Sequence, residues 1–98
     1  MKFRMKIYRV ENEILVAVCD SNLIGKKFQD EGIRIEINEN FYGEDEVEEE
    51  EVKKALEEAT IANISGERAV RLAIRIGIVD ENNVLKIKEC WHAQMVTM

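Results

Sequence analysis

The chain has 98 residues, of which 46% are hydrophobic, with no proline and a formal net charge of −6. This hydrophobic content excludes a disordered chain, and the length predicts a single domain over residues 1–98 with one core. No apolar run approaches the roughly 20 residues of a membrane-spanning helix, and residues 1–10 alternate between charged and apolar side chains, which excludes a signal peptide. We therefore expect a cytoplasmic protein that does not engage a membrane.

The acidic side chains are concentrated in one segment. Residues 39–58 hold ten of the 20 acidic residues against only two lysines, so this segment carries −8 while the rest of the chain carries +2. A uniformly acidic chain would argue against a nucleic-acid partner, because its carboxylates repel phosphates. Since the acidity is local, the net charge does not exclude an RNA-binding surface elsewhere on the chain.

Cys19 and Cys90 are the only cysteines. In a reducing cytosol they would be free, buried thiols. The composition is rich in isoleucine, lysine and glutamate, which is typical of thermophilic organisms, and intracellular disulfides do occur in such cells. A Cys19–Cys90 bridge therefore remains an alternative to two free thiols.

Three strands are predicted in the first part of the chain. Residues 2–9 alternate between apolar and polar side chains, which predicts a half-buried strand, and the polar turn at 10–13 predicts a hairpin. Residues 14–19 are continuously apolar, as in a central strand covered on both faces. Isoleucines alternate with polar residues over 33–37 and predict a third strand, which residues 41–43 close.

A helix is predicted after these strands. The acidic residues 44–51 open it, because the helix dipole favours negative charge at the N-terminus. From residue 52 to residue 62, apolar side chains recur at the i, i+3, i+4, i+7 spacing of an amphipathic helix.

A second helix is predicted to follow directly. Gly66 ends or kinks the first helix, and Ser65 is positioned to cap the next one over residues 67–76. Gly77 then stops the second helix. The segment 59–70 is therefore expected to form a corner between two helices.

The last segment, residues 84–97, is predicted to be extended. In an uninterrupted register its side chains alternate between the two sheet faces, and a bulge would reverse part of the assignment. One face then carries Lys86, Lys88, Cys90, His92 and Gln94, and the other carries Leu85, Ile87, Trp91, Ala93 and Met95. The order β-β-β-α-α-β-β predicts an α+β fold, a mostly antiparallel sheet of about five strands with two helices on one face.

The first candidate site is the sheet face opposite the helices. RNA-binding sheets combine cations for the phosphates with flat rings for the bases. Strand alternation directs such side chains to this face from three strands: Lys2, Arg4, Lys6, Tyr8, Arg34, Lys86, Lys88, His92 and Gln94. The alternative is a solvated face whose lysines and arginines pair with glutamates.

The second candidate is the helix junction, which comprises Thr60, Asn63, Ser65, Gly66, Glu67 and Arg68. A glycine before a helix N-terminus can present amides to an anion, as in helix-hairpin-helix elements, but those need a second glycine and a different alanine spacing. We therefore favour a structural corner in which Asn63 and Ser65 bond to the backbone. Pairing with Glu67 and the acidic helix is favoured over phosphate binding for three arginines: Arg68, Arg71 and Arg75.

The third candidate is Cys90-Trp91-His92 together with Cys19. Cys90 and His92 could share a metal that Cys19 and Asp20 complete, but neither a CxxC nor an HxxxH pattern supports this. Nothing marks an oxyanion hole for a Cys–His catalytic pair, and phosphate-loop, dinucleotide and nucleophile-elbow motifs are absent. We expect no metal, no cofactor and no catalytic residue.

Several segments together resemble the archaeal domain-of-unknown-function family 424. They are LVAVCD followed by LIGK, FYG before an acidic helix, ATIANISGERAV, a GIV stop and a terminal HAQMV. The resemblance spans nearly the whole chain and implies an archaeal source and a small stand-alone α+β protein, with no established activity to carry over. The matching segments single out Tyr42, Gly43, Asn63, Gly66, Glu67, Arg68, His92 and Gln94.

The main functional hypothesis rests on two observations: the acidic residues are concentrated in one segment, and strand alternation directs basic side chains to one face of the sheet. The hypothesis is a non-enzymatic binding module that contacts RNA or a ribonucleoprotein through the basic sheet face. The alternative is a protein–protein interaction module that docks through its acidic helix or a sheet edge. A small enzyme would need a deep pocket containing His92 with Cys90 or Glu67.

Overall fold

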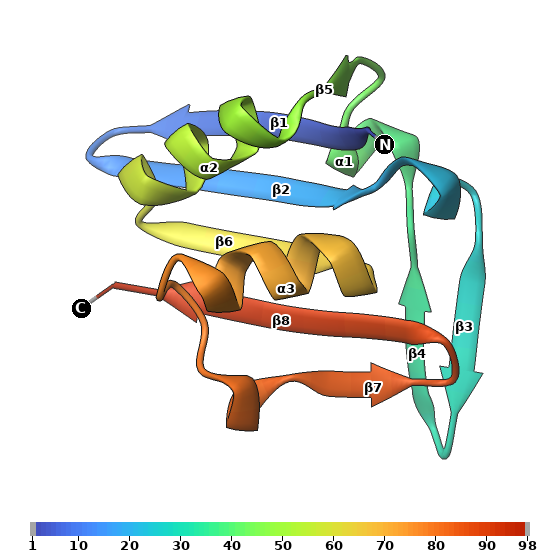
Figure 1. Cartoon of the computed structure of the whole chain (residues 1–98). Helices are drawn as coiled ribbons and strands as arrows, with labels where there is room; N and C mark the ends of the chain where they lie inside the picture. The colour runs from blue at the N-terminus through green and yellow to red at the C-terminus, as the bar shows by residue number, and fades with distance from the viewer. Residues whose placement is uncertain (1, 98) are drawn as a thin grey trace.

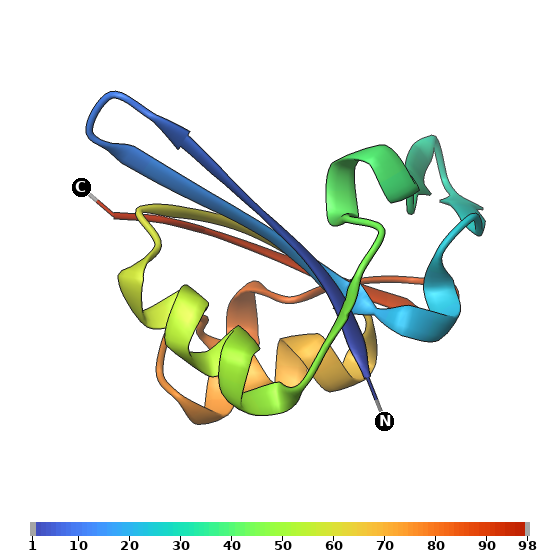
Figure 2. The same ribbon diagram turned by 90° about the horizontal axis from the view of Figure 1, so that it is seen from above.

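In the computed structural model, which describes residues 2–97, a six-stranded sheet lies between two unequal layers (Figures 1 and 2). Two helices cover one face, and a short helix with a two-stranded hairpin covers part of the other. The strands of the main sheet lie side by side in the order β5 (Glu46–Val47), β1 (Phe3–Val10), β2 (Glu13–Asp20), β6 (Ile61–Ser65), β8 (Cys90–Val96) and β7 (Leu85–Ile87).

The sheet is mixed. β2 and β6 run parallel at its centre, whereas the other neighbours are antiparallel. A parallel pair needs a long crossover connection, and here the crossover holds residues 21–60. The α+β class and the central strand over 14–19 are confirmed. The expected mostly antiparallel sheet of about five strands is corrected to a mixed sheet of six with a separate sheet of two.

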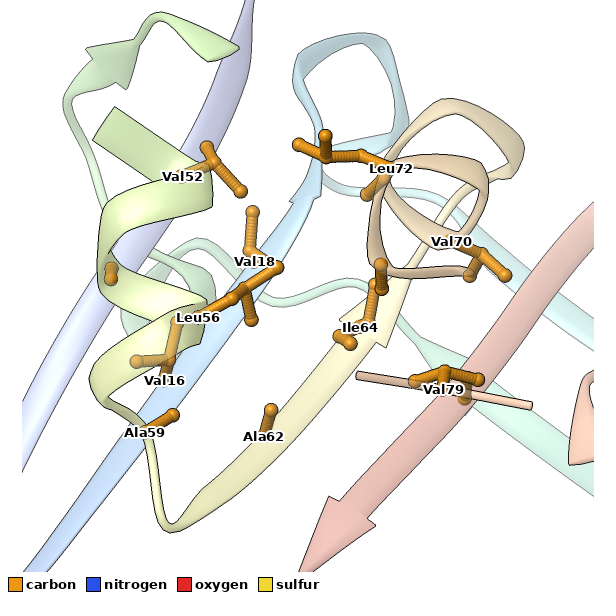
Figure 3. Packing of buried hydrophobic residues seen from close by; sticks show 14 of the residues in the cluster. Val16, Val18, Val52, Leu56, Ala59, Ala62, Ile64, Val70, Leu72 and Val79 are labelled. Carbon is orange, nitrogen blue, oxygen red and sulfur yellow. The ribbon is translucent and has the colours of Figure 1, made fainter. Parts of the chain in front are cut away.

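Both longer helices pack on one face of the sheet, as predicted. They are α2 (Glu49–Glu58) and α3 (Glu67–Arg75). Figure 3 shows Val52 and Leu56 of α2 and Leu72 of α3 over Val18 of β2 and Ile64 of β6. Each of these side chains is buried, and full burial of one contributes about 1.5–3 kcal/mol. This cluster therefore fixes the helices to the sheet.

The predicted helix ends are confirmed in part. Three glutamates fill the first turn of α2, where the dipole favours them, but α2 begins at Glu49 rather than at residue 44 because β5 pairs with β1. α3 stops at Gly77 as predicted, with the Ile78 N–H donating to the Ala73 carbonyl at 2.9 Å. No helix among residues 2–97 is long and apolar enough to cross a membrane.

The second layer lies on the opposite face. It contains α1 (Glu39–Tyr42) and the hairpin β3 (Lys27–Asp30) and β4 (Ile33–Glu36), with a 3-10 turn at Ser21–Leu23. Buried apolar residues of this layer and of strands β2 and β8 form a second core: Ala17, Cys19, Leu23, Ile37, Tyr42 and Cys90. The β1–β2 hairpin extends beyond α1, so this layer leaves part of the sheet face open (Figure 2).

The strand expected over 33–37 forms, but outside the main sheet. It pairs with β3 in the two-stranded sheet, and a tight turn through Glu31 and Gly32 joins them. Residues 41–43 do not close a strand, because Phe41 and Tyr42 end α1. The alternation of apolar and polar residues correctly predicts an extended segment here, but it does not identify the strand with which the segment pairs.

The corner predicted at 59–70 is wrong. α2 ends at Glu58, and Ile61–Ser65 forms β6 between β2 and β8. Thr60 guides the chain into the sheet, since its N–H donates to the Ile14 carbonyl (2.8 Å) and its hydroxyl accepts from the Ile14 N–H (2.7 Å). Over such a short apolar run, helical spacing and strand alternation fit equally well.

The single extended segment predicted over 84–97 is a hairpin. The chain turns at Lys88, whose φ is +55°, and β7 pairs back onto β8 with Lys86 opposite Trp91 and Leu85 opposite His92. The assignment of side chains to the two faces of the sheet is therefore reversed for the residues before the turn. Lys86 lies on the helix face of the sheet with Trp91, not with His92 and Gln94 as predicted.

Candidate functional site

A hydrogen-bonded chain of three polar side chains crosses the sheet face under α1. Tyr42 of α1 and Ser65 of β6 are hydrogen-bonded through their hydroxyls at 2.9 Å, and the Ser65 hydroxyl lies 2.9 Å from His92 Nδ1 on β8. Ser65 is fully buried and Tyr42 nearly so. These bonds tie α1 to the two strands.

Burial keeps this chain uncharged. Desolvation lowers the pKa of His92 below its ordinary value of 6.5 and raises the pKa of Tyr42 above 10.0. At neutral pH the imidazole and the phenol are therefore both neutral. A fully buried Ser65 hydroxyl cannot meet a substrate, so the arrangement acts as a structural clamp.

Next to this chain, Asn63 and Gln94 form a second polar pair on the same face. The Gln94 amide donates to Asn63 Oδ1 at 3.0 Å, and the two residues are direct neighbours on β6 and β8. Four of the residues singled out by the family resemblance thus lie close together: Tyr42, Asn63, His92 and Gln94.

The junction before α3 is also closed by internal bonds. Asp20 is buried at the end of β2, and its carboxylate accepts from the N–H groups of Arg68 (3.1 Å) and Ala69 (2.8 Å). Burial raises the pKa of Asp20, and these two bonds act against that rise. An anion would need the same amides, so the structural interpretation of the junction is favoured over the anion site.

Two glycines allow close approaches at this side of the molecule. Gly66 has φ +106°, and a Cβ there would lie 2.5 Å from Asp20 Cγ. At Gly43, with φ +105°, a Cβ would lie 2.5 Å from the Met5 carbonyl oxygen. Glycine is the residue that tolerates both the conformation and the contact.

The basic side chains predicted on β1 are engaged with α1 and the segment after it. Arg4 donates to Glu39 Oε2 and to the Gly43 carbonyl, both at 3.2 Å. Lys6 donates to the Asn40 carbonyl at 3.1 Å. The Tyr8 hydroxyl donates to the Phe41 carbonyl at 2.8 Å, and Lys2 pairs with Glu48 at 3.3 Å. These cations hold neighbouring elements in place.

The remaining predicted residues are dispersed. Arg34 lies on β4 and pairs with Glu36 at 3.7 Å, and Lys88 lies in the turn between β7 and β8. Lys86 is on the opposite face of the sheet. Of the nine predicted residues, all within the described range, Tyr8 and His92 are partly covered and Gln94 is exposed on the predicted face, and the nine do not form a continuous basic surface.

A different basic and aromatic site lies on the helix side. Trp91 of β8 is half-buried, with the Arg71 guanidinium carbon 4.7 Å and Lys86 Nζ 4.3 Å from its ring centroid. These residues line an open pocket of about 500 Å³, which we call the Trp91 pocket. Its lining comprises Arg71, Ile74, Arg75, Glu81, Val84, Lys86 and Trp91.

The arginines of the Trp91 pocket also form ion pairs. Arg71 pairs with Glu67 at 2.9 Å within α3, and Arg75 pairs with Glu49 of α2 at 3.2 Å. The pairing predicted for these two residues is confirmed. The guanidinium of Arg68 lies 4.8 Å from the Phe3 ring centroid.

The pocket could have been found in part from the sequence. The sequence places Arg68, Arg71 and Arg75 at helical spacing, and alternation groups Trp91 with the apolar residues of its strand. Lys86 was assigned to the wrong face, because the register was carried through a segment that contains a turn. With Lys86 on the wrong face, the sequence does not bring Arg71, Arg75 and Lys86 together around the Trp91 ring.

Neither cysteine offers a reactive site. Cys19 and Cys90 are free and fully buried. Burial raises the pKa of Cys19 to about 12 and also raises the pKa of Cys90, so both are neutral thiols. Within residues 2–97, no group of three or more His, Cys, Asp or Glu side chains is placed to hold a metal ion.

Comparisons with known proteins address the family and the fold. The family described as proteins of unknown function, DUF424, matches residues 8–98. A crystal structure of an uncharacterized conserved protein from Methanopyrus kandleri is similar, with a TM-score of 0.79 and 21% identity over 100% of this chain and 95% of that one. No curated protein matches significantly. The predicted resemblance is therefore confirmed, and this chain belongs to the DUF424 family.

Proposed function

We propose that the protein is a non-enzymatic cytoplasmic binding module that contacts RNA or a ribonucleoprotein through the Trp91 pocket. The observation that carries this proposal is the gathering of Arg71, Arg75 and Lys86 around the only tryptophan of the chain. Cations bind RNA phosphates, and an aromatic ring offers a stacking surface for a base. The interface thus moves from the predicted sheet face to the helix side.

The local charge of the pocket supports an anionic partner. Its lining holds three cations and a single carboxylate, that of Glu81, although the whole chain carries −6. The side chains in the Arg71–Glu67 and Arg75–Glu49 pairs are all more than half exposed. Exposed ion pairs contribute about 0–1 kcal/mol each, so RNA phosphates can replace these carboxylates at small cost.

The polar chain of the sheet face supports a role without catalysis. A nucleophile must be exposed to its substrate, and Ser65 has no exposed surface. Its hydroxyl is already shared between Tyr42 and His92. The two neutral, buried cysteines offer no better nucleophile.

RNA titration of matched charge-reversal variants tests the proposal. A fluorescein-labelled RNA hairpin with a single-stranded loop is titrated with protein at low salt, and anisotropy reports binding. We expect Lys86→Glu to weaken binding about tenfold, because it repels phosphate at the pocket. Lys27→Glu makes the same charge change on the exposed hairpin of the opposite face and should bind like the wild type. Equal weakening by both variants, or no binding by the wild-type protein, contradicts the proposal.

A second candidate function, protein–protein interaction, rests on the outer edge of β1. β5 pairs with Phe3 and Arg4, and beyond them no strand of the described chain pairs with this edge. Ile7 and Val10 are exposed there, at 39% and 65%. A neighbouring groove of about 320 Å³ is lined by Tyr8, Val10, Glu13, Leu15, Phe41 and Ile61. An extended peptide could add a strand to such an edge.

Affinity capture with and without nuclease separates the two functions. If RNA is the partner, nuclease treatment releases the captured material. If a protein docks on the β1 edge, the captured material resists nuclease and is lost in a Val10→Lys variant.

A further inference from the structure

The Trp91 pocket combines an apolar wall with a charged rim. Trp91, Ile74 and Val84 contribute apolar surface, whereas Arg71, Arg75 and Lys86 contribute cations. α3 bounds the pocket on one side and β7 on the other, since Lys86 and Trp91 are direct cross-strand neighbours. A volume of about 500 Å³ lies in the range of small-molecule sites, roughly 300–1,000 Å³.

We propose that this pocket accepts one unpaired nucleotide of an RNA strand. The base packs against Trp91 and the apolar wall, and the flanking phosphates contact Arg71, Arg75 and Lys86. This inference rests on the proposed function and specifies its ligand. A pocket of this kind binds an RNA single strand, loop or end more tightly than a regular duplex.

The concavity of the site is the reason for preferring an unpaired nucleotide. In an A-form helix both faces of each base are stacked, and the major groove is too deep and narrow for side chains to read. A paired base cannot turn into a pocket without leaving its helix. A nucleotide in a loop or single strand is already unstacked, so it can enter without that cost.

The present contacts of Trp91 are compatible with a stacked base. Arg71 and Lys86 lie over its ring, so a base that stacks on Trp91 takes the place of one of these cations. The side chain of Arg71 is 60% exposed, so it can move aside or stack on the base itself. Within the described chain no carboxylate pairs with Lys86, so its charge is available to a phosphate.

Tryptophan fluorescence offers a direct test, because Trp91 is the only tryptophan. Wild-type protein is titrated with a 12-nucleotide single-stranded RNA, with the same strand in a duplex, and with inorganic phosphate. We expect the single strand to quench the emission, the duplex to require about tenfold more RNA for the same quenching, and phosphate to leave the emission unchanged.

A fluorescein label on the same RNA provides the second readout and the controls. Trp91→Leu keeps an apolar residue in the pocket and should weaken binding of the single strand to the level of the duplex. Lys27→Ala should change neither readout. Circular dichroism confirms that each variant is folded. If Trp91→Leu alters the fold, Lys86→Ala replaces it and should weaken single-strand binding while the quenching at saturation persists.

The failure of this inference differs from the failure of the proposed function. Equal binding of single strand and duplex, without quenching of Trp91, overturns the single-nucleotide pocket but leaves RNA binding intact. Absence of any anisotropy change with either RNA overturns both. Quenching by inorganic phosphate alone also overturns the inference, because it assigns the site to a free anion.

Discussion

His92 shows how much one side chain depends on its surroundings. It is the only histidine, and its Nδ1 lies against the Ser65 hydroxyl in a part of the sheet that α1 covers. Burial lowers the pKa of His92. Its spacing from Cys90 allowed a metal site or a catalytic pair, which no sequence motif supported, and in the fold its Nδ1 lies against the Ser65 hydroxyl.

We predict that His92 makes stability depend on pH. Because its folded pKa lies below the unfolded value of about 6.5, the unfolded state binds more protons below that pH. The free energy of unfolding should therefore fall as the pH drops through 6.5 towards the folded pKa, by no more than about 1.4 kcal/mol per pH unit. Urea unfolding of wild type and His92→Gln between pH 7.5 and 5.5 measures this contribution.

The control is the pH dependence of the variant. Subtracting the His92→Gln curve removes the contribution of the carboxylates, including Asp20, which both proteins retain. A single imidazole signal in the proton NMR spectrum gives the pKa directly. A value at or above 6.5 would contradict the burial that the structure shows.

Gly66 is the second residue whose environment makes a clear prediction. Both Gly66 (φ +106°) and Gly25 (φ +86°) have left-handed backbones, but only at Gly66 would an added methyl group have another atom within 4 Å. Gly25→Ala should cost about 1 kcal/mol for the backbone alone, and Gly66→Ala should cost about 3 kcal/mol or more because the methyl group meets Asp20. Equal losses in urea unfolding would be evidence against this close approach.

At the scale of elements, α3 depends on a residue far away in the sequence. The Asp20 carboxylate caps its first turn from the end of β2. Ser65, the cap that the sequence suggests, instead bonds to Tyr42 and His92. Capping by a residue 48 positions away leaves no local pattern, because the link exists only once β2 and β6 pair.

We predict that Asp20→Ala lowers the free energy of unfolding by about 1–2 kcal/mol, the usual loss for a helix cap. Asp20→Asn keeps one oxygen that can accept from the Ala69 N–H and removes the cost of burying a charge, so it should lose less. Urea unfolding at neutral pH compares the two variants. Equal losses for Asn and Ala would contradict this, because they would show that the charge, which both variants lack, matters rather than the hydrogen bond.

The elements also show where the sequence was sufficient. Residues 2–9 and 14–19 form the predicted hairpin, and the stop at Gly77 is correct, because each rests on a local hydrophobic pattern or on local turn chemistry. The segment 59–65 was misassigned because its five-residue strand is stabilised by neighbours on both sides. The turn at Lys88 was missed because no glycine or proline marks it.

For the whole molecule, the arrangement of layers explains why the predicted site was misplaced. A single flat sheet with helices on one side would leave a basic face free. Instead α1 and the β3–β4 hairpin cover part of that face (Figure 2). Arg4, Lys6 and Tyr8 bond to α1 and to Gly43, which follows it. The residue types were informative, but their partners depend on how distant segments pack.

The net charge of −6 gives the RNA proposal its sharpest test. An acidic protein repels RNA at long range, so binding must come from the local cations of the Trp91 pocket. If Arg71, Arg75 and Lys86 each replace a counterion on single-stranded RNA, the plot of log affinity against log salt has a slope of about −2.

The most direct measurement is therefore this salt dependence, determined by anisotropy with the wild-type protein and with Lys86→Glu. We predict that wild-type affinity falls about 20-fold between roughly 50 and 200 mM salt, and that the slope becomes shallower by about 0.7 in the variant. A slope near zero, or the same slope for both proteins, would contradict RNA binding through the Trp91 pocket.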